Sequence, residues 1–376
     1  MKTNSGWDRR SLFKAAALTA LAGALPAPLA ALEASTSAVA PVASLPKVDI
    51  AENRIIKQVA GLRPFRRSGF VLRAESLGDK TVIHNYGHGG CGITLSWGTA
   101  NMALRLALET PHRRAAVIGC GAIGLTMARM LQDHGFDVTI YAAALPPDTT
   151  SNVAAGLFGV TEIAATEELE GAFKPQLQEA VRFAHRYFQP FVGRDYGVEW
   201  LTFYMIGDEP QTQPPDFAVT PELYPLTTYG PGEHPFPTRY AASFPTMIAA
   251  TNIFLPRLVD EFVARGGRIV VRAFHAREEL GGLAEPLLVN CTGLGARALF
   301  GDDELVPIKG QLTLLRPQAD IDYCYLDGRR FTYMFPRSDG IILGGSHEEG
   351  VDTTTPDPAV ATRIFATHKA IIDGMR

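Results

Sequence analysis

Residues 115–124 read Ala-Ala-Val-Ile-Gly-Cys-Gly-Ala-Ile-Gly, and this stretch decides the fold. Its first four residues are apolar and predict a buried strand, and the helical pattern that follows runs to about residue 134. A second strand is predicted over residues 137–142, which completes a βαβ unit. The Gly-x-Gly-x-x-Gly spacing permits a tight turn, the approach of a pyrophosphate and close helix packing. The stretch therefore predicts a dinucleotide-binding α/β domain, and alone it does not distinguish FAD from NAD.

The acidic residue that binds an adenosine ribose is missing from the end of the second predicted strand. Residues 141–144 read Tyr-Ala-Ala-Ala, with Ala143 in place of the acidic residue. Such a carboxylate normally accepts hydrogen bonds from the ribose hydroxyls. Its absence weakens an NAD-dependent interpretation and leaves the contacts of an FAD ribose open.

The chain has 376 residues and a formal net charge of −4. This length is sufficient for two domains that share a core. The first 30 residues carry Lys2, Arg9, Arg10 and Lys14 against Asp8, a charge of +3, which leaves −7 on the rest. An acidic body argues against nucleic acid or an anionic membrane as partner. The four cysteines have neither paired nor metal-ligand spacing, so they are expected to be small buried residues, and no metal site is predicted.

The N-terminus is interpreted as an export signal. Residues 8–14 read Asp-Arg-Arg-Ser-Leu-Phe-Lys, and the apolar run that follows over residues 15–25 is too short to span a bilayer. The pair Arg9 and Arg10 resembles the twin-arginine signal, although Asp8 stands where Ser or Thr is usual. An ordinary Sec signal is the alternative. The protein is therefore expected to be exported, periplasmic or secreted, with the export machinery as a partner and no stable membrane anchor.

A second glycine-rich stretch lies upstream of the first. Residues 82–92 read Val-Ile-His-Asn-Tyr-Gly-His-Gly-Gly-Cys-Gly, and residues 94–100 continue Thr-Leu-Ser-Trp-Gly-Thr-Ala. This stretch resembles the signature of the D-amino acid oxidase family at nearly every position. The likeness runs from about residue 54 to the end of the chain and is weakest over residues 161–237. Further segments resemble that family's other motifs: Gly-Leu-Arg-Pro at 61–64, Thr-Thr-Ser-Asn-Val-Ala-Ala-Gly-Leu at 149–157, Val-Asn-Cys-Thr-Gly at 289–293, Lys-Gly-Gln at 309–311 and Tyr-Met-Phe-Pro at 333–336.

The resemblance implies FAD as cofactor and an α/β fold with two domains. One is a Rossmann-type FAD-binding domain, and the second is a mainly antiparallel β substrate domain. Apolar runs predict strands for the second domain at residues 311–315, 331–335 and 341–344. The predicted organisation is a signal peptide and linker start at 1–35, a linker at 36–53, a segment at 54–112 that resembles the family's C-terminal part, the FAD-binding domain at 113–195 and 245–305, the substrate domain at 196–244 and 306–350, and a C-terminal helix at 351–376.

The order of the motifs differs from the family's order. In the family, the segments that correspond to residues 61–64 and 84–87 close the chain, whereas here they precede the glycine turn at 119–124. The simplest account is a circular permutation, with the family's two ends fused through residues 109–113. Permutation is tolerated where chain ends are superficial and close together. A scrambled gene is the alternative.

The resemblance also implies roles for individual residues. Arg63 is expected to hold the substrate α-carboxylate as a two-pronged ion pair, which suits guanidinium geometry. Tyr333 is expected to donate its hydroxyl to the same carboxylate, and the Gly90 carbonyl to accept from the α-amino group. The start of the helix that follows is expected to face the flavin pyrimidine, where its positive end stabilises reduced flavin. The predicted cofactor-binding residues are Gly89, Gly90, Gly92, Thr94, Gly119, Cys120, Gly121, Ala122, Ile123, Gly124, Thr150, Ser151, Ala155, Gly156, Leu157, Phe274 and Thr292.

The implied reaction is the oxidative deamination of a D-amino acid. Hydride passes from the substrate Cα to flavin N5, and the imino acid hydrolyses to a keto acid and ammonia. O₂ then reoxidises the flavin and yields hydrogen peroxide. Three alternatives stay open: a dehydrogenase that passes electrons to a carrier, a flavin fold that binds an amino acid without turnover, and an NAD-dependent dehydrogenase, in which residues 84–87 have no role.

The side-chain preference depends on the segment before Tyr333. The family's second active-site tyrosine has no clear counterpart, with Tyr323 and Tyr325 as candidates and Arg329 standing nearer. If Arg329 points inward, its charge favours D-aspartate or D-glutamate. If it points to solvent, as most loop arginines do, small to medium neutral D-amino acids are expected, because a desolvated carboxylate without a partner is heavily penalised. We expect the solvent-facing arrangement.

Overall fold

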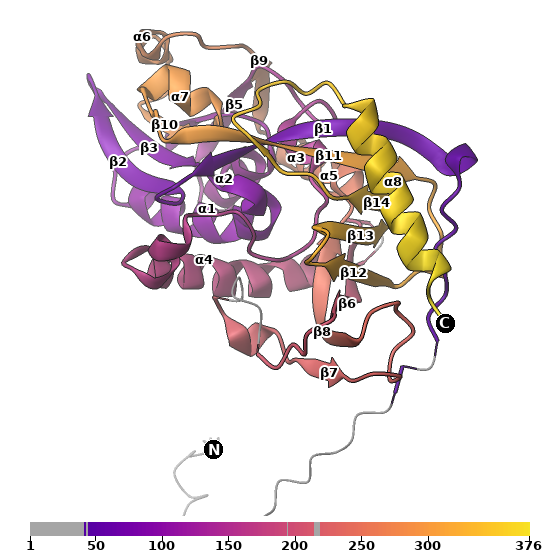
Figure 1. Cartoon of the computed structure of the whole chain (residues 1–376). Helices are drawn as coiled ribbons and strands as arrows, with labels where there is room; N and C mark the ends of the chain where they lie inside the picture. Colours follow the sequence, from indigo (N-terminus) through magenta and orange to yellow (C-terminus); the bar gives the residue numbers. More distant parts are fainter. Residues whose placement is uncertain (1–40, 43, 194, 214–218) are drawn as a thin grey trace, which may run out of the picture. The chain divides into compact units, whose positions relative to one another are not determined.

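Two β-sheets form the framework of the computed structural model, which describes residues 41–42, 44–193, 195–213 and 219–376 (Figure 1). The proposed signal peptide, with Arg9 and Arg10, lies outside the described residues. Within the described ranges, no helix combines the length and apolar character that a bilayer crossing requires.

The first sheet has six strands in the order β2-β3-β10-β4-β5-β9. Five of them are parallel, and β2 pairs antiparallel with β3 at one edge. Because helices and loops cover both faces, its central strands are continuous apolar runs rather than alternating ones. The strands are β2 (Val71–Leu77), β3 (Lys80–Tyr86), β4 (Arg114–Ile118), β5 (Asp137–Ala142), β9 (Arg268–Val271) and β10 (Leu287–Asn290).

Helices pack closely around this sheet. The Thr126 hydroxyl of α2 donates to the Ser96 carbonyl of α1 at 2.9 Å. A Cβ at Gly98 of α1 would overlap the Ala180 carbonyl of α4, so only glycine permits this approach of two helices. The helices are α1 (Gly92–Leu108), α2 (Ala122–Asp133), α4 (Phe173–Phe188) and α5 (Thr251–Ala264), with the short α3 (Thr150–Val153), α6 (Arg277–Gly281) and α7 (Gly295–Phe300) between them.

The second sheet follows the order β1-β11-β14-β13-β12-β6-β8-β7, and the short β15 also pairs with β11. All its pairings are antiparallel except that of β12 with β6. Helix α8 (Pro358–Asp373) packs against β11, β13 and β14 (Figure 1). The strands are β1 (Ile55–Arg66), β6 (Val198–Gly207), β7 (Thr227–Tyr229), β8 (Tyr240–Ala249), β11 (Leu305–Leu315), β12 (Tyr323–Asp327), β13 (Thr332–Arg337), β14 (Gly340–Gly344) and β15 (Glu348–Glu349). The predicted fold class, a Rossmann-type α/β domain with a mainly antiparallel second domain, is confirmed.

The segment at 54–112 is divided between the two sheets. Strand β1 occupies residues Ile55–Arg66 of this segment and joins the antiparallel sheet. Strands β2 and β3 and helix α1 belong instead to the parallel sheet. The predicted segment is therefore continuous in sequence but serves both domains.

The predicted linker at 36–53 is wrong over its described C-terminal part. Val48 and Ile50 are 2% and 7% exposed and lie in the same apolar cluster as Met375. The Tyr323 hydroxyl donates to the Pro46 carbonyl at 2.9 Å. This stretch is packed into the second domain because its apolar side chains cover the sheet beneath α8, and it does not behave as a free spacer.

The last residues of the chain lie beside the first packed ones. Lys47 Nζ donates to the Met375 carbonyl at 2.5 Å, although the two residues are separated by most of the chain. The connection between α1 and β4 is also short, because α1 ends at Leu108 and β4 begins at Arg114. Within the predicted C-terminal segment at 351–376, the helix runs from Pro358 to Asp373, and Asp357 caps its start by accepting from the Ala359 amide.

Candidate active site

A cavity of about 660 Å³ is lined by residues from both sheets. Its longer part follows the carboxyl ends of β4, β5 and β10, where ligands bind in open α/β sheets. Its other part is bounded by apolar and aromatic residues of the antiparallel sheet. The volume falls within the usual range of small-molecule and cofactor sites, roughly 300–1,000 Å³.

The glycine turn after β4 opens onto this cavity. Gly119 has a φ of +118°, and a Cβ there would overlap the Cys291 carbonyl, so the turn requires glycine. Helix α2 starts without a side-chain cap on its N-cap residue, Gly121, although the Ala122 amide donates to Ser151 Oγ at 3.0 Å. The positive end of α2 therefore faces the cavity, as a pyrophosphate site requires.

The adenosine end of the cavity contains charged residues that the sequence analysis did not identify. Ala143 lines the cavity as predicted for the ribose position and offers no carboxylate. Asp148 and Arg272 also line this end, with the Arg272 guanidinium 4.6 Å from the centre of the Phe274 ring. They were missed because neither follows the usual acidic position at the end of β5.

The second glycine-rich segment brings the start of α1 to the same cavity. Gly89 has a φ of +52°, and a Cβ there would overlap the Glu162 carbonyl. The Gly90 amide donates to this same carbonyl at 3.2 Å. The His88 ring forms a 3.0 Å hydrogen bond between Nε2 and Thr99 Oγ1. Burial lowers the pKa of His88 to about 3, so its ring is neutral. The backbone of the turn is thus fixed against the segment that follows α3.

Two of the predicted cofactor-binding residues do not line the cavity. Gly124 packs against the Gly119 carbonyl, where a Cβ would overlap it. The Thr94 hydroxyl donates to the Gly159 carbonyl at 2.9 Å, which holds α1 against the segment that follows α3. The other predicted residues line the cavity: Gly89, Gly90, Gly92, Gly119, Cys120, Gly121, Ala122, Ile123, Thr150, Ser151, Ala155, Gly156, Leu157, Phe274 and Thr292.

The predicted carboxylate anchor is brought together from opposite ends of the chain. Arg63 on β1 and Tyr333 on β13 approach until Arg63 Nη2 lies 3.5 Å from the tyrosine hydroxyl. The guanidinium lies on Gly310 of β11, where a Cβ would come within 2.5 Å of Nη2. The Tyr333 ring lies in the same way on Gly344 of β14. Glycines at these two strand positions therefore allow both side chains to reach one point in the cavity.

Both groups of this anchor are hydrogen-bond donors. Within the described residues, Arg63 Nη1 is buried and has no hydrogen-bond partner. Burial raises the pKa of Tyr333 above its usual range, with Arg63 opposing the rise, so the hydroxyl keeps its proton at neutral pH. A carboxylate is the ligand group that satisfies a guanidinium edge and a hydroxyl donor at once.

Glu162 is a further charged residue beside this anchor. Its Oε2 lies 3.1 Å from Arg63 Nε, and its other oxygen contacts His347 Nδ1. Its backbone φ is +50°, which is uncommon for a residue other than glycine. Glu162 was not predicted, because it lies in the region of weakest resemblance and its positive φ is visible only in the structure.

Neither candidate for the second active-site tyrosine lies in the cavity. The Tyr325 hydroxyl is 2.7 Å from His368 Nδ1, and Tyr323 faces Pro46, so both belong to the core beneath α8. Tyr224 and Phe331 line the cavity instead. Other aromatic and aliphatic wall residues on the antiparallel sheet are Leu62, Phe203, Phe244, Leu312, Leu326 and Phe335.

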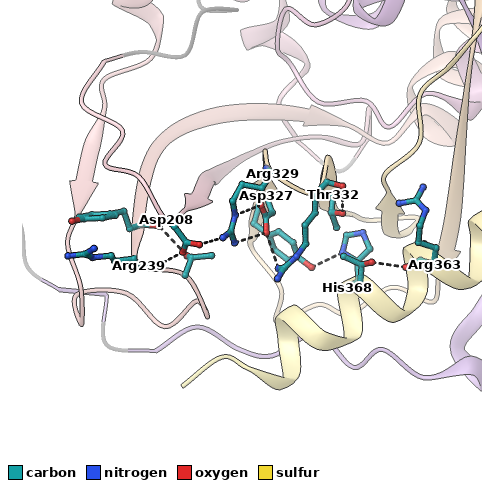
Figure 2. Close-up of polar contacts among 12 residues, drawn as sticks. Asp208, Arg239, Asp327, Arg329, Thr332, Arg363 and His368 are labelled. Carbon is teal, nitrogen blue, oxygen red and sulfur yellow. Dashed lines mark hydrogen bonds and ion pairs between the residues drawn. The ribbon is translucent and has the colours of Figure 1, made fainter.

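Arg329 lies outside the residues that line the cavity. Figure 2 shows it between Asp208 and Asp327, and it forms ion pairs with both carboxylates. Its side chain is 43% exposed. The solvent-facing arrangement expected from the sequence agrees with this position.

These features fit an FAD molecule. Two helix N-termini, those of α1 and α2, open onto one elongated cavity, and neither has a side-chain cap. Close glycine turns at both places let a ligand reach the backbone amides. The glycine turn at 119–124 would hold the pyrophosphate, and residues 89–92 would face the isoalloxazine ring.

Comparison with known proteins agrees with this geometry. The family model described as FAD dependent oxidoreductase, DAO, matches residues 114–374. A D-amino-acid oxidase of Rubrobacter xylanophilus is 31% identical over 266 residues, which cover 70% of this chain and 78% of the relative. A human D-aspartate oxidase is 27% identical over 257 residues, 67% of this chain and 74% of the relative. The crystal structure of glycine oxidase from Geobacillus kaustophilus, at 15% identity, has a TM-score of 0.53 over 70% of this chain and 80% of that one, which shows a shared fold.

We predict that Gly121→Val abolishes retention of FAD. A Cβ at this position already lies 2.9 Å from Ser151 Oγ, and two further methyl groups fill the space that a pyrophosphate must enter. Visible flavin absorbance relative to protein absorbance, measured after purification, should fall at least about tenfold. Gly207→Ala is the matched control, because a Cβ there meets nothing within 4 Å. Full flavin content in Gly121→Val would place the pyrophosphate elsewhere.

Proposed function

The chain belongs to the DAO family of FAD-dependent oxidoreductases, and on this premise we propose that it oxidises D-amino acids to keto acids, ammonia and hydrogen peroxide. It is an FAD-dependent amino acid oxidase. The observation that carries the proposed substrate is the convergence of Arg63 and Tyr333 on one point of the cavity, close to Gly90. Such an anchor recognises an α-carboxylate and leaves the amino group beside a backbone carbonyl.

The protein's own contribution is to bind and orient the amino acid. The Nη edge of Arg63 and the Tyr333 hydroxyl hold the carboxylate, and the Gly90 carbonyl accepts from the amino group. These contacts fix the Cα between them, and such positioning converts an encounter into an effectively intramolecular step. Bound FAD supplies the two-electron acceptor for the Cα hydride. No side chain in this arrangement needs to act as a base toward Cα.

The overall reaction balances with water and O₂ as co-reactants. The amino acid loses a hydride from Cα and a proton from nitrogen, which gives an imino acid. Water adds to the carbon–nitrogen double bond, and ammonia leaves to give the keto acid. The two electrons reach O₂, which takes up two protons and becomes hydrogen peroxide. A carrier in place of O₂ accepts the same two electrons without forming peroxide.

The proposed substrates have small to medium neutral side chains. The wall that faces the anchor is apolar and aromatic, with Phe203, Phe244 and Leu326 among its members. The cation that an acidic side chain needs is not supplied by Arg329, which is engaged by Asp208 and Asp327. A buried carboxylate without a partner costs several kcal/mol, roughly, which disfavours D-aspartate and D-glutamate.

We infer that the chain is a circular permutation of the family's order. The family model begins its match at residue 114, whereas Arg63 and Gly90 precede that point. Two observations support this inference: residues 109–113 form a short connection between α1 and β4, and Lys47 contacts Met375. Both junctions of the rearrangement are therefore short in space. The order of this chain and the order of the family then bring the same strands together.

We also infer that the protein is exported through the twin-arginine route. The support is the sequence of residues 8–25, with Arg9 and Arg10 before an apolar run. A protein that folds around a tightly bound cofactor suits a route that carries folded proteins.

We expect D-amino acids to bleach the visible flavin absorbance when they are added without oxygen. Under air the same substrates should yield peroxide in proportion to keto acid.

Arg63→Ala should lower kcat/KM by about 10²–10³, because loss of one partner of a buried charged pair costs roughly 2–5 kcal/mol. Tyr333→Phe should cost less, since it removes one hydrogen bond. Bleaching without peroxide would assign the electrons to a carrier, and wild-type kinetics in Arg63→Ala would move the substrate site.

A relinked chain in the family's order should fold and retain FAD. The design starts at residue 113, runs to Arg376, continues through a short Gly-Ser linker into residue 44, and ends at residue 110. The contact between Lys47 and Met375 means that the linker spans a short gap. Its unfolding temperature and flavin content should match those of the natural order. A control opened between Gly119 and Cys120 should fail to bind FAD, and failure of the first design would contradict the permutation.

Changing both Arg9 and Arg10 to Lys should leave the protein inside the cell. A twin-arginine signal distinguishes Arg from Lys, whereas a Sec signal needs only positive charge. The measurement is the distribution of full-length and processed protein between cell fractions. Export at the wild-type level would return the segment to the Sec class.

A further inference from the structure

Four of the described residues that line the cavity carry a formal charge: Arg63, Asp148, Glu162 and Arg272. Asp148 and Arg272 lie at the adenosine end with Ala143. Glu162 is thus the carboxylate, among these lining residues, that stands at the substrate end beside Arg63. The family resemblance assigned no role to this position.

Glu162 is held firmly in place. One oxygen lies 3.1 Å from Arg63 Nε, and the other contacts His347 Nδ1. Its backbone carbonyl accepts from the Gly90 amide at 3.2 Å. Its side chain is 18% exposed, and its φ of +50° belongs to a strained region that surrounding contacts must maintain. Phe331, which also has a positive φ, packs edge-on against both His347 and Tyr333.

The two edges of the Arg63 guanidinium have different partners. Glu162 occupies Nε, while Nη1 has no partner within the described residues and Nη2 lies near the Tyr333 hydroxyl. The Nη edge is therefore the edge available to a substrate α-carboxylate. With Glu162 in place, the polar end of the cavity is neutral before a zwitterionic substrate enters. A substrate with a second carboxylate brings an extra negative charge into a site that already holds Glu162.

We propose that Glu162 sets the charge selectivity of the substrate site, admitting D-amino acids with neutral or cationic side chains and excluding acidic ones. This inference rests on the proposed oxidation of D-amino acids. Like charges a few ångströms apart in a partly desolvated cavity repel strongly, because the effective dielectric constant is far below that of water. A residue that only orients Arg63 would instead affect all substrates to the same extent, since every substrate uses the same α-carboxylate.

The test compares isosteric substrate pairs in wild type and in Glu162→Gln. The quantities are the ratios of kcat/KM for D-Asp over D-Asn and for D-Glu over D-Gln. Loss of the negative charge should raise both ratios by about tenfold or more. Two matched controls should leave the ratios unchanged: Glu167→Gln, which removes an exposed ion pair with Arg67, and Arg329→Ala. Unchanged ratios in Glu162→Gln, with a uniform loss for all substrates, would overturn the proposal.

A binding measurement tests the same charge effect without turnover. Butyrate and succinate have similar length and differ by one carboxylate, and their affinities can be read from perturbation of the flavin spectrum. Wild type should bind succinate at least about tenfold more weakly than butyrate, and Glu162→Gln should reduce this difference. Equal affinities in wild type would contradict the proposal, whether or not the variant folds. A wild type that is not reduced by any D-amino acid would instead refute the proposed function, while the binding comparison still reports on Glu162.

Discussion

The partly buried guanidinium group of Arg63 is the constraint that determines the structure at the substrate end of the cavity. Arg63 lies on β1 against Gly310 of β11, and its charge must be compensated in a space that solvent reaches poorly. Glu162 compensates it from one side, and the Tyr333 hydroxyl approaches from the other. The pairing of β1 with β11 brings the arginine to this place, and the pairing of β13 with β14 brings the tyrosine. The antiparallel sheet is therefore the scaffold of the anchor, while the parallel sheet supplies the cofactor's cradle.

Much of this arrangement was predictable because its local signals are strong. The apolar run at 115–118 and the glycine spacing at 119–124 specify a strand, a turn and a helix start through sterics alone. Strand β5 has the predicted bounds for the same reason, because it is short and mostly buried. Strands β6 and β8 were not predicted, because they pair with each other across more than 30 residues of intervening sequence and because β6 does not alternate regularly between buried and exposed residues.

The residues of the site also fall into two groups, those that the sequence predicted and those that it did not. Gly89 and Gly119 act through the backbone of a turn. They were predicted because a turn with a positive φ requires glycine, and the glycine is visible in the sequence. Glu162, Tyr224 and Phe331 were not, because they reach the cavity only through tertiary packing. Tyr323 and Tyr325 show the converse: aromatic residues close to Tyr333 along the chain point to the opposite face of the sheet, beneath α8. Proximity in sequence was a poor guide where strands alternate faces.

The place of β10 in the parallel sheet has a consequence for how the chain matures during synthesis. Strands β3 and β4 are joined through a single helix, α1, yet they are not neighbours, because β10 lies between them and pairs with both. A ribosome must therefore release about 170 more residues after β4 before Leu287–Asn290 can fill the gap. Until then, two apolar strands present open edges in the middle of an unfinished sheet, which is where nascent chains aggregate.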